Sequence, residues 1–93
     1  MQLGAPELRI YEVEDVAREV RRRGYRLEKG EQLEGCYLES DAVILVRLGL
    51  SSTARAGTIL HELLHACGVD DERTIGQIEQ GLTPVLLSQG WRP

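Results

Sequence analysis

Both histidines of this 93-residue chain lie in one pentapeptide, His61-Glu62-Leu63-Leu64-His65. Apolar residues around it recur at helical spacing, Ser51 and Ser52 precede it and Gly68 follows it, which predicts a helix over about residues 53–67. Residues four apart on an α-helix lie about 40° apart around the axis and about 6 Å apart along it. The two imidazoles therefore project from one face of one helix, close enough to bind a single metal ion.

Glu62 lies about 100° further round this helix than His61. Its carboxylate is poorly placed to bind the same ion but can reach a water bound to that ion. Bound Zn²⁺ lowers the pKa of such a water from about 15.7 to about 7. We therefore expect Glu62 to be a general base that takes the proton of the water and delivers it to a leaving amine.

The alternative interpretation is a core helix whose two histidines bind nothing. The metal site is favoured because both histidines of the chain fall in one pattern, with a glutamate in the required place. We expect one Zn²⁺, since two imidazoles and a carboxylate with one open position suit that ion.

The rest of the sequence predicts a single α+β domain over residues 1–93, with a core of Leu, Ile and Val because Phe is absent. The expected elements are a strand at 8–11, a helix at 12–23, two or three further strands, the histidine helix and a last helix at 71–89. Two of those strands form a hairpin that pairs 35–39 with 42–48, and residues 25–28 are the candidate for the third. The last helix is expected to bury a stripe formed by Ile75, Ile78, Leu82, Val85 and Leu86.

Charge and hydropathy exclude several classes of function. A net charge of −4 argues against a nucleic-acid binder, and the basic cluster Arg21–Arg23 is interpreted as a solvated helix end. The longest apolar run, Ala42–Val46, is too short to cross a membrane. No signal peptide is visible, so a cytoplasmic protein is expected. Cys36 and Cys67 do not make a disulfide framework.

A third metal ligand has to come from outside the pentapeptide. Asp71 completes the pattern H-E-x-x-H-x-x-G-x-x-D, in which metzincins carry their third ligand. That family also needs a methionine turn further along, and the only methionine here is Met1. Asp71 is also well placed to cap the last helix. The metzincin interpretation therefore fails at its second requirement.

Two glutamates on the last helix are the other candidates. Glu72 and Glu79 are seven residues apart and share nearly one helix face. Glu79 lies between Ile75 and Leu82 on the apolar stripe, where a carboxylate is costly unless it is paired or coordinated. Cys67 is excluded as a ligand because it lies about 200° round the helix from the second histidine.

Residues 35–91 resemble small phage-encoded zinc metallopeptidases, which are relatives of the minimal gluzincins and of the metallopeptidases that cleave phage-type repressors. The resemblance lies in the hairpin GCYLES–AVILVRLGLSS, the helix TILHELLHACG and the segment DERTIGQIEQGL. Matches to the family pattern in the last helix are Glu72, Ile75, Ile78, Gly81 and Leu82. Glu79 stands where a small apolar residue is usual.

This resemblance implies a minimal zincin-like fold, in which a small sheet packs on an active-site helix and a C-terminal helix. It favours His61, His65 and Glu72 as ligands of one Zn²⁺, with Glu62 as the base that hydrolyses a peptide or protein substrate. Glu79 and Asp71 are the alternatives for the third ligand.

In zincins the strand before the active helix forms the edge of the cleft and pairs with an extended peptide. The resemblance therefore implies that a strand contacts the substrate through Val43, Ile44, Leu45 and Val46. A continuous apolar run is equally typical of an interior strand, so the residues leave edge and interior open.

No residue is selected as the donor that stabilises the oxyanion of peptide hydrolysis. Tyr37 and Arg73 are candidates, and downstream of His65 the chain has no Tyr or His. A zinc-binding interaction or regulatory protein with weak or absent catalysis is therefore the alternative function.

Overall fold

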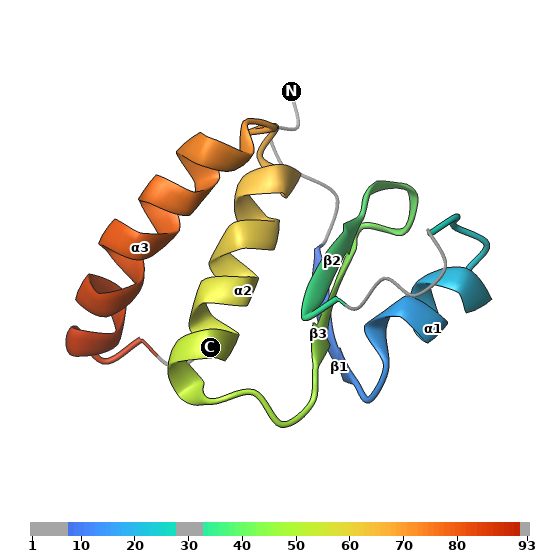
Figure 1. Ribbon diagram of the computed structural model, residues 1–93, viewed down its shortest axis with the longest axis horizontal. Helices are drawn as coiled ribbons and strands as arrows, with labels where there is room; N and C mark the ends of the chain where they lie inside the picture. Colours follow the sequence, from blue (N-terminus) through green and yellow to red (C-terminus); the bar gives the residue numbers. More distant parts are fainter. Residues whose placement is uncertain (1–7, 28–32, 92–93) are drawn as a thin grey trace.

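The computed structural model describes residues 8–27 and 33–91 as a sheet with helices on both faces (Figure 1). The elements in order are β1 Arg9–Val13, α1 Val16–Arg22, β2 Gly35–Leu38, the short 3₁₀ helix η1 Glu39–Asp41, β3 Val43–Arg47, α2 Ser52–Ala66 and α3 Glu72–Ser88. α1 covers one face of the sheet, α2 covers the other, and α3 packs on α2 away from the sheet. The predicted α+β class is confirmed. In the described part of the chain, no helix has the length and apolar character needed to cross a membrane.

The sheet has the strand order β1-β3-β2, so β3 is its central strand. β3 pairs in parallel with β1 and antiparallel with β2, which confirms the predicted hairpin.

The prediction that a substrate pairs with this strand through Val43, Ile44, Leu45 and Val46 is wrong. Both edges of β3 already pair with neighbouring strands, and all four side chains are buried. Within the described residues β2 pairs only with β3, so the free edge next to the histidine helix belongs to β2.

The side chains of β3 alternate between two hydrophobic clusters, as a strand buried on both faces requires. Val43 and Leu45 pack with the apolar face of α1, whereas Ile44 and Val46 pack with Ile59 of α2. Trp91, close to the end of the chain, packs against the second cluster. The sheet therefore holds α2 in place through its most deeply buried residues.

The helix predicted over 12–23 begins later, at Val16. The strand β1 occupies the first residues of that range, and Asp15 caps the helix by accepting a hydrogen bond from the Arg18 backbone N–H at 3.0 Å. The helix ends before Gly24, whose φ of +91° is a conformation that glycine adopts without strain. Its predicted end is confirmed.

Of the two or three strands expected after the first helix, the described residues form two, and residues 25–27 are not part of a third. Residues 25–27 have no regular secondary structure, and Glu28 lies outside the described residues. Tyr25 and Leu27 instead pack against the hydrophobic cluster under α1. Their burial comes from this loop packing, which an alternating pattern alone does not distinguish from a strand.

α3 buries less of its apolar stripe than predicted. Ile75 is fully buried, and Ile78 and Leu86 are half-buried, but Leu82 and Val85 are 45% and 53% exposed. The reason is that α3 packs on one neighbour, α2, and its remaining faces meet solvent. α3 is therefore the least anchored of the long elements.

Candidate metal centre

α2 carries His61, Glu62 and His65 on the side that faces α3 and β2. The helix begins after Ser51, whose hydroxyl accepts a hydrogen bond from the Ala54 backbone N–H at 3.2 Å. It ends just before Gly68, and the φ of Gly68 is +92°. The two imidazole centroids are 5.1 Å apart. The four-residue spacing therefore places both rings on one face, as predicted.

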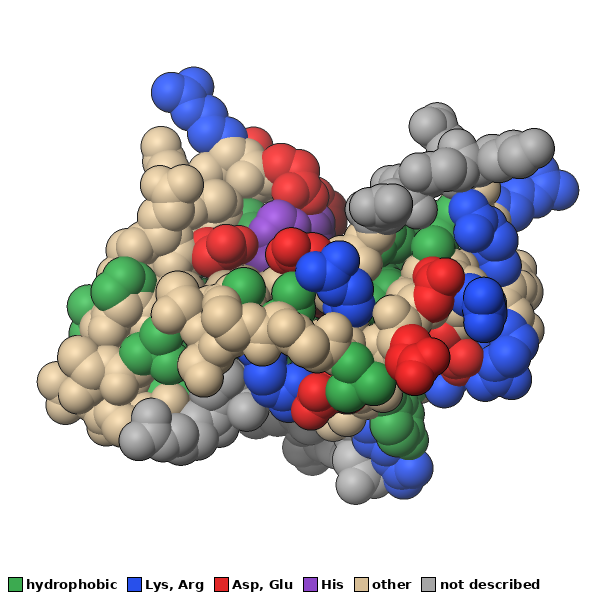
Figure 2. Space-filling model, turned by 60° about the horizontal axis from the view of Figure 1, so that its bottom comes forward, with side chains coloured by type: hydrophobic (Ala, Val, Ile, Leu, Met, Phe, Trp, Pro, Cys, Tyr) green, Lys and Arg blue, Asp and Glu red, His purple; other side chains and the backbone are tan. Residues whose placement is uncertain are grey.

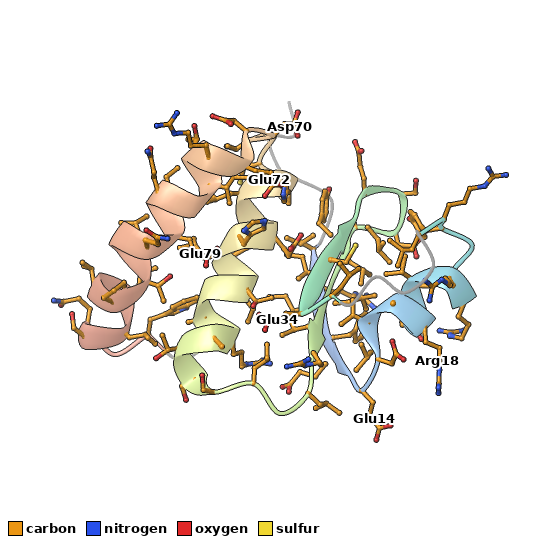
Figure 3. All side chains as sticks on the ribbon, viewed as in Figure 1. Glu14, Arg18, Glu34, Asp70, Glu72 and Glu79 are labelled. Atoms are coloured by element: carbon orange, nitrogen blue, oxygen red, sulfur yellow. The ribbon has the colours of Figure 1, made fainter. Side chains whose placement is uncertain are left out.

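The carboxylate of Glu72, which is labelled in Figure 3, lies against both imidazoles. Its Oε1 is 2.8 Å from His65 Nε2, and its Oε2 is 3.2 Å from His61 Nε2. One ligand atom from each of the three residues can be chosen so that all lie within 4.8 Å of one another. The first residue of α3 thus joins the two histidines of α2 in one group that could hold a metal ion.

The three residues fit a zinc ion by donor type, since zinc binds imidazole nitrogen and carboxylate oxygen at about 2.0–2.2 Å. Each imidazole Nε2 contacts a different oxygen of the Glu72 carboxylate. Three protein ligands are also the number found in catalytic zinc sites, which keep one position open.

Glu79, the second candidate ligand, contacts the far side of the first histidine. Its Oε1 lies 3.0 Å from His61 Nδ1, so it does not approach the Nε2 atoms that face Glu72. A carboxylate at Nδ1 favours the tautomer with its proton there, which leaves the Nε2 lone pair free for a metal. We assign Glu79 to the orientation of His61.

The room for Glu79 comes from a glycine inside α2. A Cβ added at Gly57 would lie 3.2 Å from Glu79 Oε2 and 3.5 Å from its Cδ. Gly57 is four residues before His61 and therefore on the same helix face. A glycine in a helix interior, where no turn requires it, is the sequence signal that could have revealed this approach.

Asp71, the third candidate, caps α3. Its carboxylate accepts hydrogen bonds from the Thr74 hydroxyl and from the Arg73 backbone N–H, the latter at 3.3 Å. These bonds, with the Thr74 hydroxyl contributing most, lower the pKa of Asp71. The side chain is thus engaged with its own helix. Cys67 also lies outside the ligand group.

Glu62 lies between the imidazoles and the free edge of β2. Burial raises the pKa of its carboxyl, while the charges of His61 and His65 and a hydrogen bond from the Tyr37 backbone N–H act in the opposite direction. The Tyr37 contact was not predicted from the sequence, because it depends on which strand forms the edge. It places the Glu62 carboxylate next to β2, beside the candidate metal ligands.

Two open hollows meet at Glu62. One of ≈ 560 Å³ lies on the side of His65 and is lined by β2 and the end of α2. The other, of ≈ 360 Å³, lies on the side of His61 and includes Glu79. Figure 2 shows acidic side chains gathered next to the two histidines on this face. His61 and His65 therefore each line one of two adjoining hollows along β2, and Glu62 lines both.

The two candidate oxyanion donors differ in position. Tyr37 lines the larger hollow together with Glu62 and His65. Arg73 is exposed at the start of α3 and is not among the residues that line either hollow. Of the two, only Tyr37 belongs to the cleft.

Comparisons of this chain with protein-family models, with curated proteins and with solved structures found no match.

Proposed function

We propose that this chain is a zinc-dependent metallopeptidase of the zincin type. His61, His65 and Glu72 would bind one Zn²⁺, and Glu62 would act as the general base. The observation that carries this proposal is the approach of the Glu72 carboxylate to both Nε2 atoms, with Glu62 beside them in an open cleft. The resemblance of residues 35–91 to small phage-encoded metallopeptidases supports the same assignment.

A Zn²⁺ bound here would polarise the scissile carbonyl and make water a nucleophile near neutral pH. Glu62 accepts a proton from that water as its oxygen bonds to the carbonyl carbon. The same carboxyl then returns the proton to the amide nitrogen as the C–N bond breaks, so peptide and water become a carboxylic acid and an amine. Glu79 would hold His61 in orientation through its contact with Nδ1.

The peptide would bind along β2. Within the described residues this strand is the edge of the sheet next to Glu62, and an extended peptide can bind at such an edge by adding a strand to the sheet. The residues on either side of the scissile bond would then occupy the two hollows. β2 therefore takes the substrate-binding role first assigned to the central strand.

The test is a zinc titration combined with a cleavage assay on a mixture of peptides from a denatured protein. We expect about one equivalent of zinc in the wild type and none in His61→Ala or His65→Ala. Glu62→Gln should keep the zinc and lose at least about 10²-fold in cleavage rate, because general-base catalysis contributes about 10²–10⁴-fold. Glu39→Gln is the matched control, since Glu39 lines the same hollow as Glu62 but contacts no histidine.

A chain that binds no added zinc would refute the metal site. Undiminished cleavage by Glu62→Gln would refute the assigned base.

The second candidate function is a zinc-binding interaction protein without hydrolysis. It is favoured by the scarcity of oxyanion donors, since Tyr37 is the only Tyr, Arg or Lys among the described residues that line the two hollows. X-ray absorption spectroscopy distinguishes the two functions. Three protein ligands and a water favour hydrolysis, whereas four protein ligands favour a structural ion.

A further inference from the structure

A third hollow, the α2–α3 pocket, continues the cleft beyond His61. It has a volume of ≈ 320 Å³ and lies between the two helices. It shares Glu34, Thr58 and Glu79 with the hollow that contains His61 and Glu62. A side chain of a peptide bound at the metal centre can therefore reach the α2–α3 pocket without leaving the cleft.

The α2–α3 pocket is rich in hydrogen-bond acceptors. Glu34 and Glu79 supply carboxylates from two sides, and none of the described residues that line the pocket is Lys, Arg or His. Glu79 uses Oε1 for His61 Nδ1, and its Oε2 lies over Gly57, which also lines the pocket. The carboxylate that orients a metal ligand is thus also part of the pocket wall.

Two further acceptors lie on α3. Thr83 is only 5% exposed, and its hydroxyl has no hydrogen-bond partner in the described part of the chain. The next residue, Pro84, has no N–H and cannot donate the usual helical bond to the carbonyl of Gln80. Thr83, Pro84 and Gln80 all line the pocket. A buried hydroxyl such as that of Thr83 needs a partner, and both this hydroxyl and the Gln80 carbonyl can accept a hydrogen bond.

We propose that the α2–α3 pocket binds a basic side chain, Lys or Arg, of the peptide substrate. Lysine and arginine carry only donors and a positive charge, which complements two carboxylates, a hydroxyl and a carbonyl to which Pro84 cannot donate. This inference rests on the proposed peptidase function and names its substrate class: peptides with a basic residue on the His61 side of the scissile bond.

The probe is a set of coumarin-labelled alanine hexapeptides with one Lys, one norleucine or one Glu at each position in turn. Binding is measured by fluorescence anisotropy to the zinc-loaded Glu62→Gln variant, which does not require cleavage. At one or two positions we expect Lys to bind about tenfold more tightly than norleucine, and Glu more weakly than norleucine. The preference should weaken with added salt, because part of it is a charge interaction.

Two substitutions test whether the preference arises in the α2–α3 pocket. Glu34→Gln should reduce the Lys preference by up to about fivefold, the upper scale of one exposed ion pair. Thr83→Val should also reduce it and should fold normally, since valine has nearly the same shape and removes an unpaired buried hydroxyl. Glu39→Gln is the control, because it removes the same charge on the His65 side of the cleft. Glu79 is left unchanged because it contacts His61.

Equal binding of Lys and norleucine peptides at every position, or no measurable binding of any Lys peptide, would overturn the proposal. So would an equal loss of preference in Glu39→Gln and Glu34→Gln, which would assign it to the general charge of the cleft. A clear Lys preference without cleavage by the wild type would support the pocket and count against hydrolysis, so the two failures are distinguishable.

Discussion

At the scale of single residues, the candidate centre depends on which nitrogen of His61 each carboxylate contacts. Glu72 approaches Nε2 and Glu79 approaches Nδ1. A metal-binding imidazole needs an unprotonated nitrogen toward the ion and benefits from an acceptor at the other nitrogen. The two glutamates of α3 therefore have different roles, although they stand seven residues apart on nearly the same helix face.

Glu79→Ala should lower zinc affinity about 10–100-fold, the usual effect of removing the hydrogen-bond partner of a metal-binding histidine. Glu79→Gln should have a smaller effect, because its amide oxygen still accepts from Nδ1–H but carries no charge. Competition with a chromophoric chelator measures both affinities. Gln80→Ala serves as the control, since it changes the neighbouring exposed residue. An unchanged affinity in Glu79→Ala would show that Glu79 does not support His61.

At the scale of elements, the sequence was sufficient where the determining signals are local. Ser51 and Gly68 lie just outside the two ends of α2, so they predicted its limits closely. The turn between β2 and β3 was predicted from the polar residues that interrupt two apolar runs. The strand order was not predictable from these signals. An apolar run such as Val43–Val46 fits an interior strand or the apolar edge of a cleft, and pairing with β1 across a long connection decides between them.

The same limit applies to the site. The spacing of the two histidines was enough to place them on one helix face, but the role of Glu79 depends on how closely α3 packs on Gly57. Leu82 and Val85 have the periodicity of buried residues and are exposed because nothing covers that face of α3 among the described residues. Periodicity indicates which face is apolar, and only the packing shows how far that face is covered.

The charge network at the end of α1 gives a pH dependence of stability at the element scale. Glu19 accepts hydrogen bonds from Arg22 and from Arg23, and Arg23 also reaches Asp41 in η1 at 3.0 Å. These bonds lower the pKa of Glu19 from 4.5 to about 2. Because the folded-state pKa is depressed, the stabilisation is fully present above about pH 4.5 and is lost as the pH falls through about 2.

Glu19→Gln should therefore lower the urea midpoint of zinc-free protein at pH 6 relative to the wild type. The difference should shrink steadily below pH 4.5 and be mostly lost by about pH 2, where half of the wild-type carboxyls are protonated in the folded state. Glu14→Gln, at an exposed carboxylate just before α1, is the control. A midpoint difference that does not change between pH 6 and pH 2 would exclude the ion pairs as its cause.

At the scale of the whole molecule, the candidate centre joins a helix that packs on the sheet, α2, to a helix that packs mainly on that helix, α3. α2 packs on the sheet through buried residues, whereas α3 packs on α2. A metal ion held by two residues of α2 and by Glu72 would link the helices at the start of α3, where the Glu72 side chain is otherwise 67% exposed. Binding should therefore stabilise α3 selectively, since the rest of the core gains no new contact.

Amide hydrogen exchange with and without zinc tests this selective stabilisation. At a zinc concentration of about 100 times Kd, binding contributes about 2.7 kcal/mol, so amides that exchange when α3 detaches should slow about 100-fold. Amides of β3 that exchange by detachment of other elements should change less. Glu72→Ala should abolish the slowing, because the remaining ligands lie on α2 alone, and should scarcely alter exchange without zinc. If zinc slowed exchange in α3 equally in Glu72→Ala, the ion would not be linking the two helices through that carboxylate.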